Sequence, residues 1–296
     1  MSEPEASAGA LLNPADLAML GRLDLAHHRP LAGLYAGERR SPRFARSPEF
    51  ADFRPYTSGD DFRQIDWKAY ARLDRLLLRL YVAEEESNLN VVIDASLSMT
   101  AGRPPKWPAT LRLAAALCFL GLAAMDRVAV GVLNRSGVST QHLRGRDGMH
   151  RLWAFIRNLD PAGAARPEDL SHLRWLRHGL VVVLSDFLVE EPWEPALSAL
   201  RGRRMEPVLW QVLAPDEERP EFSGDLKLVE VEAGSNRELT ITPGLVAEYR
   251  RALDEHRQRL GRAASGGGGR FLHTDSASTL ETAMVDGLRA GVVVRA

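Results

Sequence analysis

The sequence predicts an α/β fold: a doubly wound, mainly parallel sheet with helices on both faces, preceded by an N-terminal extension. From Asn88 onward, strand-like and helix-like runs alternate along the chain, which is typical of a sheet covered by helices. The runs at 88–96 and 179–187 are almost continuously apolar, as expected for parallel strands buried on both faces. A chain of 296 residues, 45% of them hydrophobic, is long enough for one large domain with extensions.

The chain divides into three predicted segments. Residues 1–36 form a tail with a short helix, for which Asn13 is a suitable cap and Pro14 a suitable first residue. Residues 37–86 are charged, are interrupted by prolines at the start and end in a strand, and residues 87–296 form the α/β domain. The alternation of structure therefore starts only after the first two segments.

Apolar runs and helix caps predict the elements of the α/β domain. The run 108–125 is apolar nearly all round, so its helix is expected to be buried. Thr242 and Pro243 form a good start for another helix. The remaining strands are expected at 128–134, 138–144, 206–213, 227–233 and 270–274, and the remaining helices at 148–159, at 194–200 and around Leu280–Leu288.

Charge and cysteine content exclude several functions. The net charge of -1 and the absence of a basic patch argue against a nucleic-acid partner. The single cysteine, Cys118, excludes a disulfide within the chain and fits a reducing compartment. The longest near-apolar stretch, 113–125, is about half the length that crosses a bilayer. We therefore expect a cytoplasmic protein without a membrane span.

Polar side chains stand at the ends of the two most apolar strands. Asp94, Ser96 and Ser98 follow one of them, and Asp186 follows the other. In parallel sheets, ligands bind beyond the carboxyl ends of the strands. Carboxylates and hydroxyls supply the oxygen ligands preferred by hard cations such as Mg²⁺ or Mn²⁺. These four residues predict a metal site, although Asp and Ser are also common as turn and cap residues.

Two stretches resemble a known fold family. The stretch DASLSM at 94–99 resembles the Asp-x-Ser-x-Ser signature that opens the metal-ion-dependent adhesion site of von Willebrand factor A domains. The stretch VVVLSDF at 181–187 is similar to the later strand of that fold, whose terminal Asp completes the site. The resemblance implies a von Willebrand factor A-like, Rossmann-like sheet that holds its ion through Asp94, Ser96, Ser98 and Asp186.

A longer signature upstream resembles the bacterial family called domain of unknown function 58, over about residues 37–190. The residues that carry it, in this order, are Arg54-Pro55-Tyr56, Gly59-Asp60-Asp61, Arg63, Ile65-Asp66-Trp67, Ala71-Arg72 and Glu84-Glu85-Glu86. This resemblance implies binding, not catalysis. It also implies an adaptor that works with a MoxR-type AAA+ ATPase in chaperone-like maturation of other proteins. The acidic side chain of the ATPase or its client would then bind to the ion.

The chain departs from the adhesion-site pattern at one point. Such sites usually include a Thr from a middle loop, which is expected here near 143–150. That stretch contains Asp147 but no Thr or Ser. Asp147 is therefore an additional candidate ligand. The alternatives are weak binding of the ion, or a partner surface that works without it.

The main rival is a Mg²⁺-dependent phosphatase of the haloacid dehalogenase type, with Asp94 as nucleophile. Such enzymes normally carry a second Asp two positions later as general acid, and Ser96 stands there in this chain. Phosphate-binding loops of the Gly-rich kinds and the Gly-x-Ser-x-Gly elbow are absent from the sequence. The residues therefore favour a non-enzymatic binding protein.

Overall fold

The computed structural model describes residues 11–26, 50–57, 60–62, 65–81, 87–134, 138–221, 224–229 and 236–295. The chain forms two compact units. The smaller comprises Arg29–Glu86, and the larger combines Met1–His28 with Ser87–Ala296. The helix of the predicted N-terminal tail thus belongs to the larger unit.

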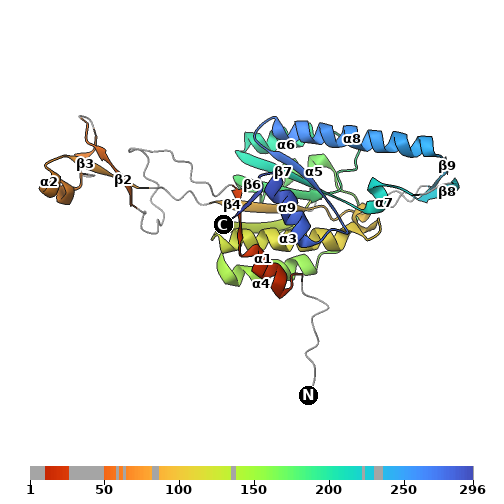
Figure 1. The fold of residues 1–296 in the computed structure, drawn as a ribbon, viewed down its shortest axis with the longest axis horizontal. Coiled ribbons are helices and arrows are strands. Elements are labelled where there is room, and N and C mark those ends of the chain that lie inside the picture. Colours follow the sequence, from red (N-terminus) through yellow and green to blue (C-terminus); the bar gives the residue numbers. More distant parts are fainter. Residues whose placement is uncertain are drawn as a thin grey trace, which may run out of the picture. The chain divides into compact units, whose positions relative to one another are not determined.

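A five-stranded parallel sheet forms the centre of the larger unit (Figure 1). Its strand order is β10-β7-β6-β4-β5, and every neighbouring pair is parallel. The strands are β4 (Asn88–Ile93), β5 (Arg127–Val132), β6 (Gly179–Ser185), β7 (Met205–Leu213) and β10 (Arg270–Asp275). All six residues of β4 are buried. The predicted α/β class and parallel sheet are confirmed.

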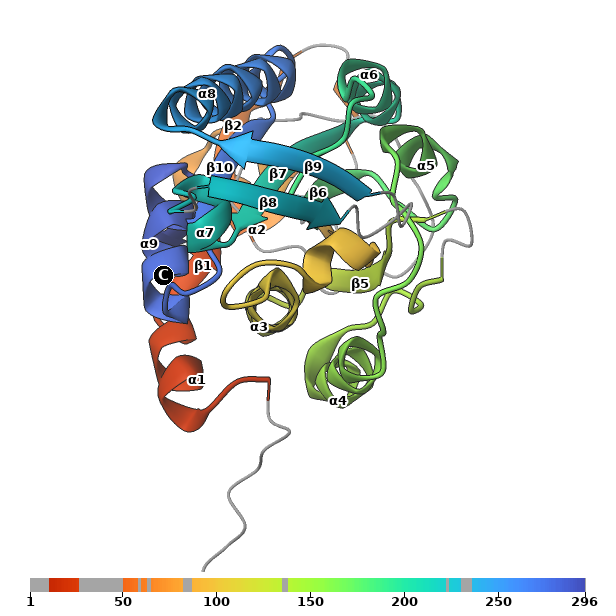
Figure 2. The ribbon, with the colours of Figure 1, turned by 90° about the vertical axis from the view of Figure 1, so that its right-hand side faces the viewer.

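Helices cover both faces of this sheet (Figure 2). One face packs against α1 (Pro14–Leu20), α3 (Lys106–Ala123), α4 (Gly145–Arg157) and α9 (Leu280–Arg289). The other packs against α5 (Pro167–His172), α6 (Glu194–Gly202) and α8 (Pro243–Ser265). Because α3 and α6 leave the sheet on opposite faces, the winding of the sheet reverses between β4 and β6. Ligands bind at such a switch point in open α/β sheets.

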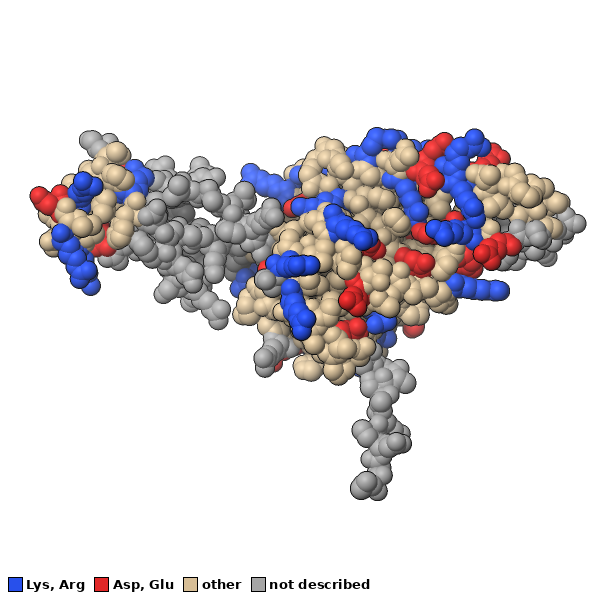
Figure 3. All heavy atoms as spheres, in the orientation of Figure 1, with Lys and Arg blue, Asp and Glu red and all other residues tan. Residues whose placement is uncertain are grey.

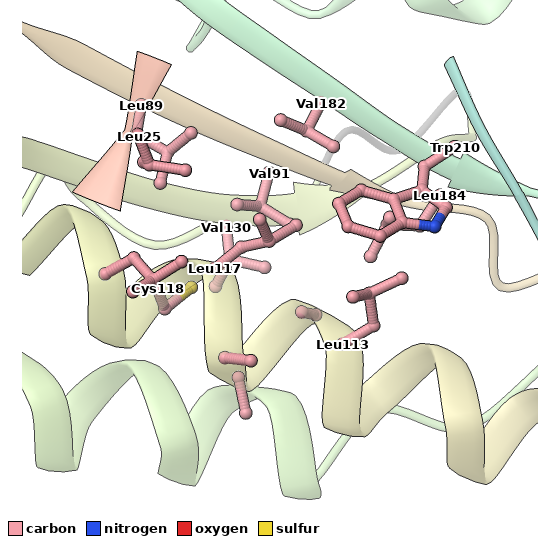
Figure 4. Close-up of a cluster of buried hydrophobic side chains, with 14 of the residues drawn as sticks. Leu25, Leu89, Val91, Leu113, Leu117, Cys118, Val130, Val182, Leu184 and Trp210 are labelled. Atoms are coloured by element: carbon pink, nitrogen blue, oxygen red, sulfur yellow. The ribbon is translucent and has the colours of Figure 1, made fainter. Parts of the chain in front are cut away.

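The core between the sheet and α3 is apolar (Figure 4). Val91 and Val130 of the strands face Leu117 and Cys118 of the helix, and Trp210 closes the same layer. Helix α3 has eleven buried residues, which confirms that it is buried nearly all round. Burial raises the pKa of the Cys118 thiol to about 12, so this cysteine is an inert part of the core.

Several short elements complete the larger unit. They are β1 (Leu23–Leu25), which pairs with β11 (Val293–Arg295), the hairpin of β8 (Gly224–Val229) and β9 (Asn236–Ile241), the four-residue helix α7 (Pro215–Glu218), and a 3-10 helix at Leu97–Thr100. The predicted caps are confirmed. Asn13 accepts the amide hydrogen of Asp16, and Thr242 accepts that of Leu245.

The stretch 138–144, expected to be a strand, makes only two isolated bridges with the edge strand β5. Gly131 pairs with Ser139 and Val128 pairs with Leu143, both antiparallel. The stretch therefore runs back along β5 to the amino edge of the sheet before α4 begins. In the part of the chain that the structure describes, no helix is both long enough and apolar enough to span a bilayer.

The smaller unit contains an antiparallel pair of strands and one helix. Strand β2 (Phe50–Pro55) pairs with β3 (Leu77–Tyr81). Helix α2 (Trp67–Leu73) begins at Asp66, whose carboxylate accepts the amide hydrogens of Lys68 and Ala69. Much of the upstream signature thus serves to build this unit, since its Asp66 is a helix cap.

Candidate functional site

The carboxyl ends of β4 and β6 bring the predicted acidic residues to one edge of the sheet. Asp94 follows β4, and Asp186 follows β6. The two strands are neighbours, with Ile93 opposite Leu184. The amide of Asp94 donates a hydrogen bond of 2.9 Å to the carbonyl of Leu184. Both carboxylates therefore lie at the switch point of the sheet.

Asp94 is buried and held by two hydrogen bonds. Its Oδ1 accepts the amide hydrogen of Ser96 at 2.9 Å, and its Oδ2 accepts the hydroxyl hydrogen of Ser185 at 2.6 Å. Burial, together with the negative charge of Asp186, raises the pKa of Asp94 to about 6. The hydrogen bonds from Ser185 and Ser96 oppose this rise but do not cancel it. Asp94 is thus a fixed carboxylate with too little positive charge around it.

Ser96 and Ser98 stand beside Asp94 with their hydroxyls together. Ser96 precedes the 3-10 helix at Leu97–Thr100 and Ser98 lies within it. Their Oγ atoms are 2.9 Å apart. Two ligands about 2.1 Å from an octahedral Mg²⁺ and at right angles to each other lie about 3 Å apart. The spacing of the two hydroxyls therefore matches one edge of such a coordination shell.

Asp186 has a different environment, because a lysine is bonded to it. The Nζ of Lys106 donates to Asp186 Oδ2 at 2.8 Å, and the exposed fractions of the two side chains are 1% and 3%. The other oxygen, Oδ1, accepts the amide hydrogen of Leu188 at 3.1 Å. Asp186 thus pairs with a cation of the protein itself.

Lys106 also joins the site to helix α7. Its Nζ donates to Glu217 Oε1, and Glu217 Oε2 accepts the amide hydrogen of Ala214 at 2.9 Å. Burial lowers the pKa of Lys106, but the carboxylates of Asp186 and Glu217 outweigh it, so the pKa lies above its ordinary value. Lys106 is therefore charged at neutral pH. The edge then holds three carboxylates, of Asp94, Asp186 and Glu217, against one ammonium.

Close packing brings the loop before Lys106 against the end of β7. Gly102 has a φ of +92°, and a Cβ placed there would lie 2.3 Å from the Cβ of Ala214. The amide of Arg103 donates to Asp216 Oδ1 at 2.9 Å. Glycine at 102 is thus required both for the backbone conformation and for the approach of the two segments.

The middle loop of the site is not where the sequence suggested. Asp147 lies in the first turn of α4, just after Leu143 has paired with Val128 at the amino end of β5. It therefore lies at the opposite edge of the sheet from Asp94. The loop that returns to the site follows α4. There, Ala162 donates to the carbonyl of Ala95 at 2.6 Å, and Leu97 donates to that of Gly163 at 3.0 Å.

The cause of this error is the stretch 138–144. It makes too few bridges to show as a strand, yet it carries the chain back along β5. The true middle loop, at 158–166, contains no Ser or Thr, and its exposed Asp160 is its one carboxylate. The loop that contacts the site therefore also lacks a hydroxyl side chain.

Sequence reasoning did not assign Lys106 or Ser185 to the site. Ser185 stands directly before Asp186, and its position at the last residue of a buried strand was a usable signal. Lys106 was recognisable by composition, since only three of the 38 basic residues are lysines. A lysine retained in so arginine-rich a chain, at the start of an apolar helix, indicates a special environment.

The residues present fit a divalent cation only in part. Asp94, Ser96 and Ser98 offer a carboxylate and two hydroxyls at a suitable spacing, and the buried Asp94 lacks a counter-charge. Asp186 fits less well as a direct ligand, because its charge is already paired with the ammonium of Lys106. Among the described residues there is no group of three or more His, Cys, Asp and Glu side chains suited to a metal. An ion here would depend on the serine hydroxyls.

Comparison with known sequences places the chain in a family. The family described as "Protein of unknown function DUF58" matches residues 52–259. The chain belongs to this family. An uncharacterized protein of Mycobacterium tuberculosis, Rv1480, is 30% identical over 279 residues, and the match covers 91% of this chain and 87% of that protein. A shorter match, 37% identical over 87 residues, is to the uncharacterized protein MAV169 of Mycobacterium avium and covers 29% of this chain and 50% of that protein.

Solved structures similar to this member of the DUF58 family share little sequence with it. BatB from Bacteroides thetaiotaomicron is 14% identical, with a TM-score of 0.41, over 69% of this chain and 98% of that one. The manganese-loaded TRAP protein of Plasmodium vivax is 11% identical, with a TM-score of 0.37, over 72% of this chain and 76% of that one.

Proposed function

We propose that this DUF58 protein is a non-enzymatic binding module that holds a divalent cation, Mg²⁺ or Mn²⁺, at the switch point of its sheet. Asp94, Ser96 and Ser98 would bind the ion directly. Asp186, which is bonded to Lys106, would lie outside these direct ligands of the ion. When bound, the ion would supply an open coordination position for an acidic side chain of a partner protein.

The observation that carries this proposal is the arrangement around Asp94. A buried carboxylate that cannot pair with a cation is unfavourable, and burial with repulsion from Asp186 raises the pKa of Asp94 to about 6. The hydroxyls of Ser96 and Ser98, which are 2.9 Å apart, are the groups that we propose share a cation with it. Ser98 is half-buried while Ser96 is buried, so solvent and ligands would reach the ion from the side of Ser98.

The charge of the direct ligands favours an acidic partner. One carboxylate and two neutral hydroxyls leave a divalent ion with a residual positive charge. Lys106 neutralises Asp186 in part, which reduces what that carboxylate can contribute to the ion. The return loop at 158–166 contains no hydroxyl to complete the shell. A carboxylate from another protein would complete both the coordination and the charge.

The partner we propose is a MoxR-type AAA+ ATPase or its client, which the family resemblance implies. In this role the DUF58 protein would be an adaptor in chaperone-like maturation of other proteins in the cytoplasm. For Asp94 we propose binding rather than nucleophilic catalysis, because Ser96 stands where phosphatases of the haloacid dehalogenase type carry a second Asp as general acid.

A thermal-melt titration with Mg²⁺ and with Mn²⁺ tests the metal site. An ion that binds only the folded protein stabilises it by about 2.7 kcal/mol at a hundredfold excess over its dissociation constant. We expect the melting midpoint of the wild type to rise with ion concentration. The midpoint of Asp94→Ala should stay constant, because the one direct carboxylate is removed.

Asp147→Ala is the matched control for this titration. Asp147 is an exposed Asp at the other edge of the sheet, so its removal should leave the rise intact. A rise that survives in Asp94→Ala, or that disappears in Asp147→Ala, would refute the assignment of the ligands. Absence of any rise in the wild type would remove the resident ion from the proposal.

The partner role is tested by measuring the affinity of the protein for a MoxR-type ATPase encoded in the same genome. We expect binding in the presence of Mg²⁺ and at least about tenfold weaker binding after chelation or in Asp94→Ala. An affinity that neither change alters would reject the metal-bridged contact. Failure of the two proteins to bind at all would reject the adaptor role.

A further inference from the structure

A cavity begins at the amino ends of the strands and runs beside the edge strand β5, and its lining is strongly basic. Its volume is about 790 Å³, within the usual range for small-molecule sites. Four of its ten lining residues are arginines, namely Arg127, Arg144, Arg174 and Arg177, and no lining residue is acidic. On the face of the larger unit in Figure 3, by contrast, basic and acidic side chains are interspersed.

This cavity is distinct from the candidate metal site. Its lining runs along the edge strand β5, from Arg127 at the start of that strand to Ser139, which pairs with Gly131. Asp94 and Asp186 instead follow β4 and β6. No residue that lines the cavity takes part in the site at the carboxyl edge.

A buried asparagine holds the cavity wall in place. Asn90 is fully buried in β4, and its Nδ2 donates to the carbonyls of Arg177 and Leu180, each at 3.0 Å. Its Oδ1 accepts the amide hydrogen of Arg177 at 3.0 Å and lies 3.1 Å from Nε2 of His142. The backbone that carries Arg177 is therefore fixed at both its N–H and its C=O.

A buried hydrogen-bond donor in the wall lacks a partner. The indole Nε1 of Trp175 is buried and makes no hydrogen bond to the described residues. The indole ring packs on Gly131 of β5, where an added Cβ would lie 2.5 Å from its Cζ2. Buried donors are normally bonded to an acceptor. Because this donor is enclosed in the wall, a ligand in the cavity does not reach it.

The side chains in the wall experience an excess of positive charge. His142 lies between two of the arginines, and its burial and the charges of Arg177 and Arg127 lower its pKa to about 4. Arg174 and Arg177 are exposed, and neither forms an ion pair with the described residues. Their guanidinium groups are thus available to an anion.

We propose that the cavity beside β5 binds a multiply charged phosphate compound of up to nucleotide size. Guanidinium groups match the geometry of phosphate oxygens with paired hydrogen bonds. Ser139, which carries a neutral hydroxyl donor, also lines the cavity. A concave, donor-rich site of this volume fits a compact polyphosphate group better than an extended acidic peptide.

Calorimetric titration of the full chain tests this proposal. The probes are inorganic tripolyphosphate and ATP, in a phosphate-free buffer with a chelator that removes divalent ions. We expect at least one probe to bind the wild type, and Arg174→Gln/Arg177→Gln to weaken it by about tenfold or more. Binding of both probes indicates that the polyphosphate group suffices, and binding of ATP alone indicates a nucleotide.

Matched variants separate this site from general surface charge and from the proposed metal site. Arg250→Gln/Arg251→Gln removes two exposed arginines of α8 and should leave the affinity unchanged. Asp94→Ala should also bind as the wild type does, whatever the outcome of the metal titration. A hexaglutamate peptide is the control probe for general attraction of acidic chains. The proposal fails if neither phosphate probe binds, if both double variants weaken binding equally, or if only the peptide binds.

Discussion

The Nζ of Lys106 lies 2.8 Å from Oδ2 of Asp186, and this buried ion pair joins the start of α3 to the end of β6. Its second carboxylate partner, Glu217, is 20% exposed, so the ammonium is enclosed between a buried and a partly buried acid. The pair fixes the orientation of the Asp186 side chain. It also couples the switch point of the sheet to helix α7.

Replacement of Lys106 should destabilise the larger unit strongly. Removing one member of a buried ion pair leaves an unpaired buried charge, which typically costs about 3–5 kcal/mol. We expect Lys106→Met to lower the free energy of unfolding by that amount in chemical denaturation. The double variant Lys106→Met/Asp186→Asn should recover part of the loss, because the unpaired carboxylate is removed as well.

An exposed cation of the same unit provides the control. Arg251 on α8 is exposed, so Arg251→Met should change the free energy of unfolding by less than about 0.5 kcal/mol. If Lys106→Met is no more destabilising than Arg251→Met, the ion pair does not have the structural role described here. Additive effects in the double variant would show that Lys106 and Asp186 are not coupled.

The sequence was sufficient to predict the sheet and the meeting of Asp94 with Asp186. Both follow long apolar runs, and the carboxyl ends of parallel strands meet at one edge. Lys106 was not predictable in the same way, because 80 residues separate it from Asp186 and only the packing of α3 brings them together. The misplaced middle loop had a different cause. Weak pairing beside β5 concealed the stretch that carries the chain away from the site.

Ser185 should contribute to stability through two hydrogen bonds. Its Oγ donates to Asp94 and also accepts the amide hydrogen of Phe187 at 2.9 Å. Ser185→Ala leaves both buried groups without this partner, so we expect a loss of about 2 kcal/mol in chemical denaturation. Ser171→Ala, at an exposed serine of α5, is the control. Equal losses in the two variants would refute the importance of the Ser185 contacts.

Gly131 should be intolerant of a side chain. A Cβ at this position would meet the indole of Trp175 at 2.5 Å and the Cβ of Ser139 at 2.7 Å. Overpacking of this kind costs about 1–3 kcal/mol, and we expect Gly131→Ala to lower the free energy of unfolding accordingly. Gly202→Ala is the control, because nothing lies within 4 Å of its added Cβ. A neutral Gly131→Ala would show that Trp175 moves aside freely.

The imidazole of His142 should make stability depend on pH. Burial, with the charges of Arg177 and Arg127, lowers its pKa from 6.5 to about 4 in the folded protein. Between these values the unfolded chain binds more protons than the folded one, so the free energy of unfolding falls as pH decreases from about 6.5 to 4. The imidazole is half-buried, and solvent screening reduces its contribution to about 1 kcal/mol.

As the pH decreases over this range, we therefore expect the free energy of unfolding of His142→Gln to fall by about 1 kcal/mol less than that of the wild type. Chemical denaturation at several pH values gives the comparison, and an NMR titration of the His142 ring gives its pKa in the folded protein directly. Parallel stability curves together with a midpoint near 6.5 would contradict the prediction. Such a result would mean that the charges of Arg127 and Arg177 do not reach the imidazole, which would also weaken the case for a basic cavity at this edge of the sheet.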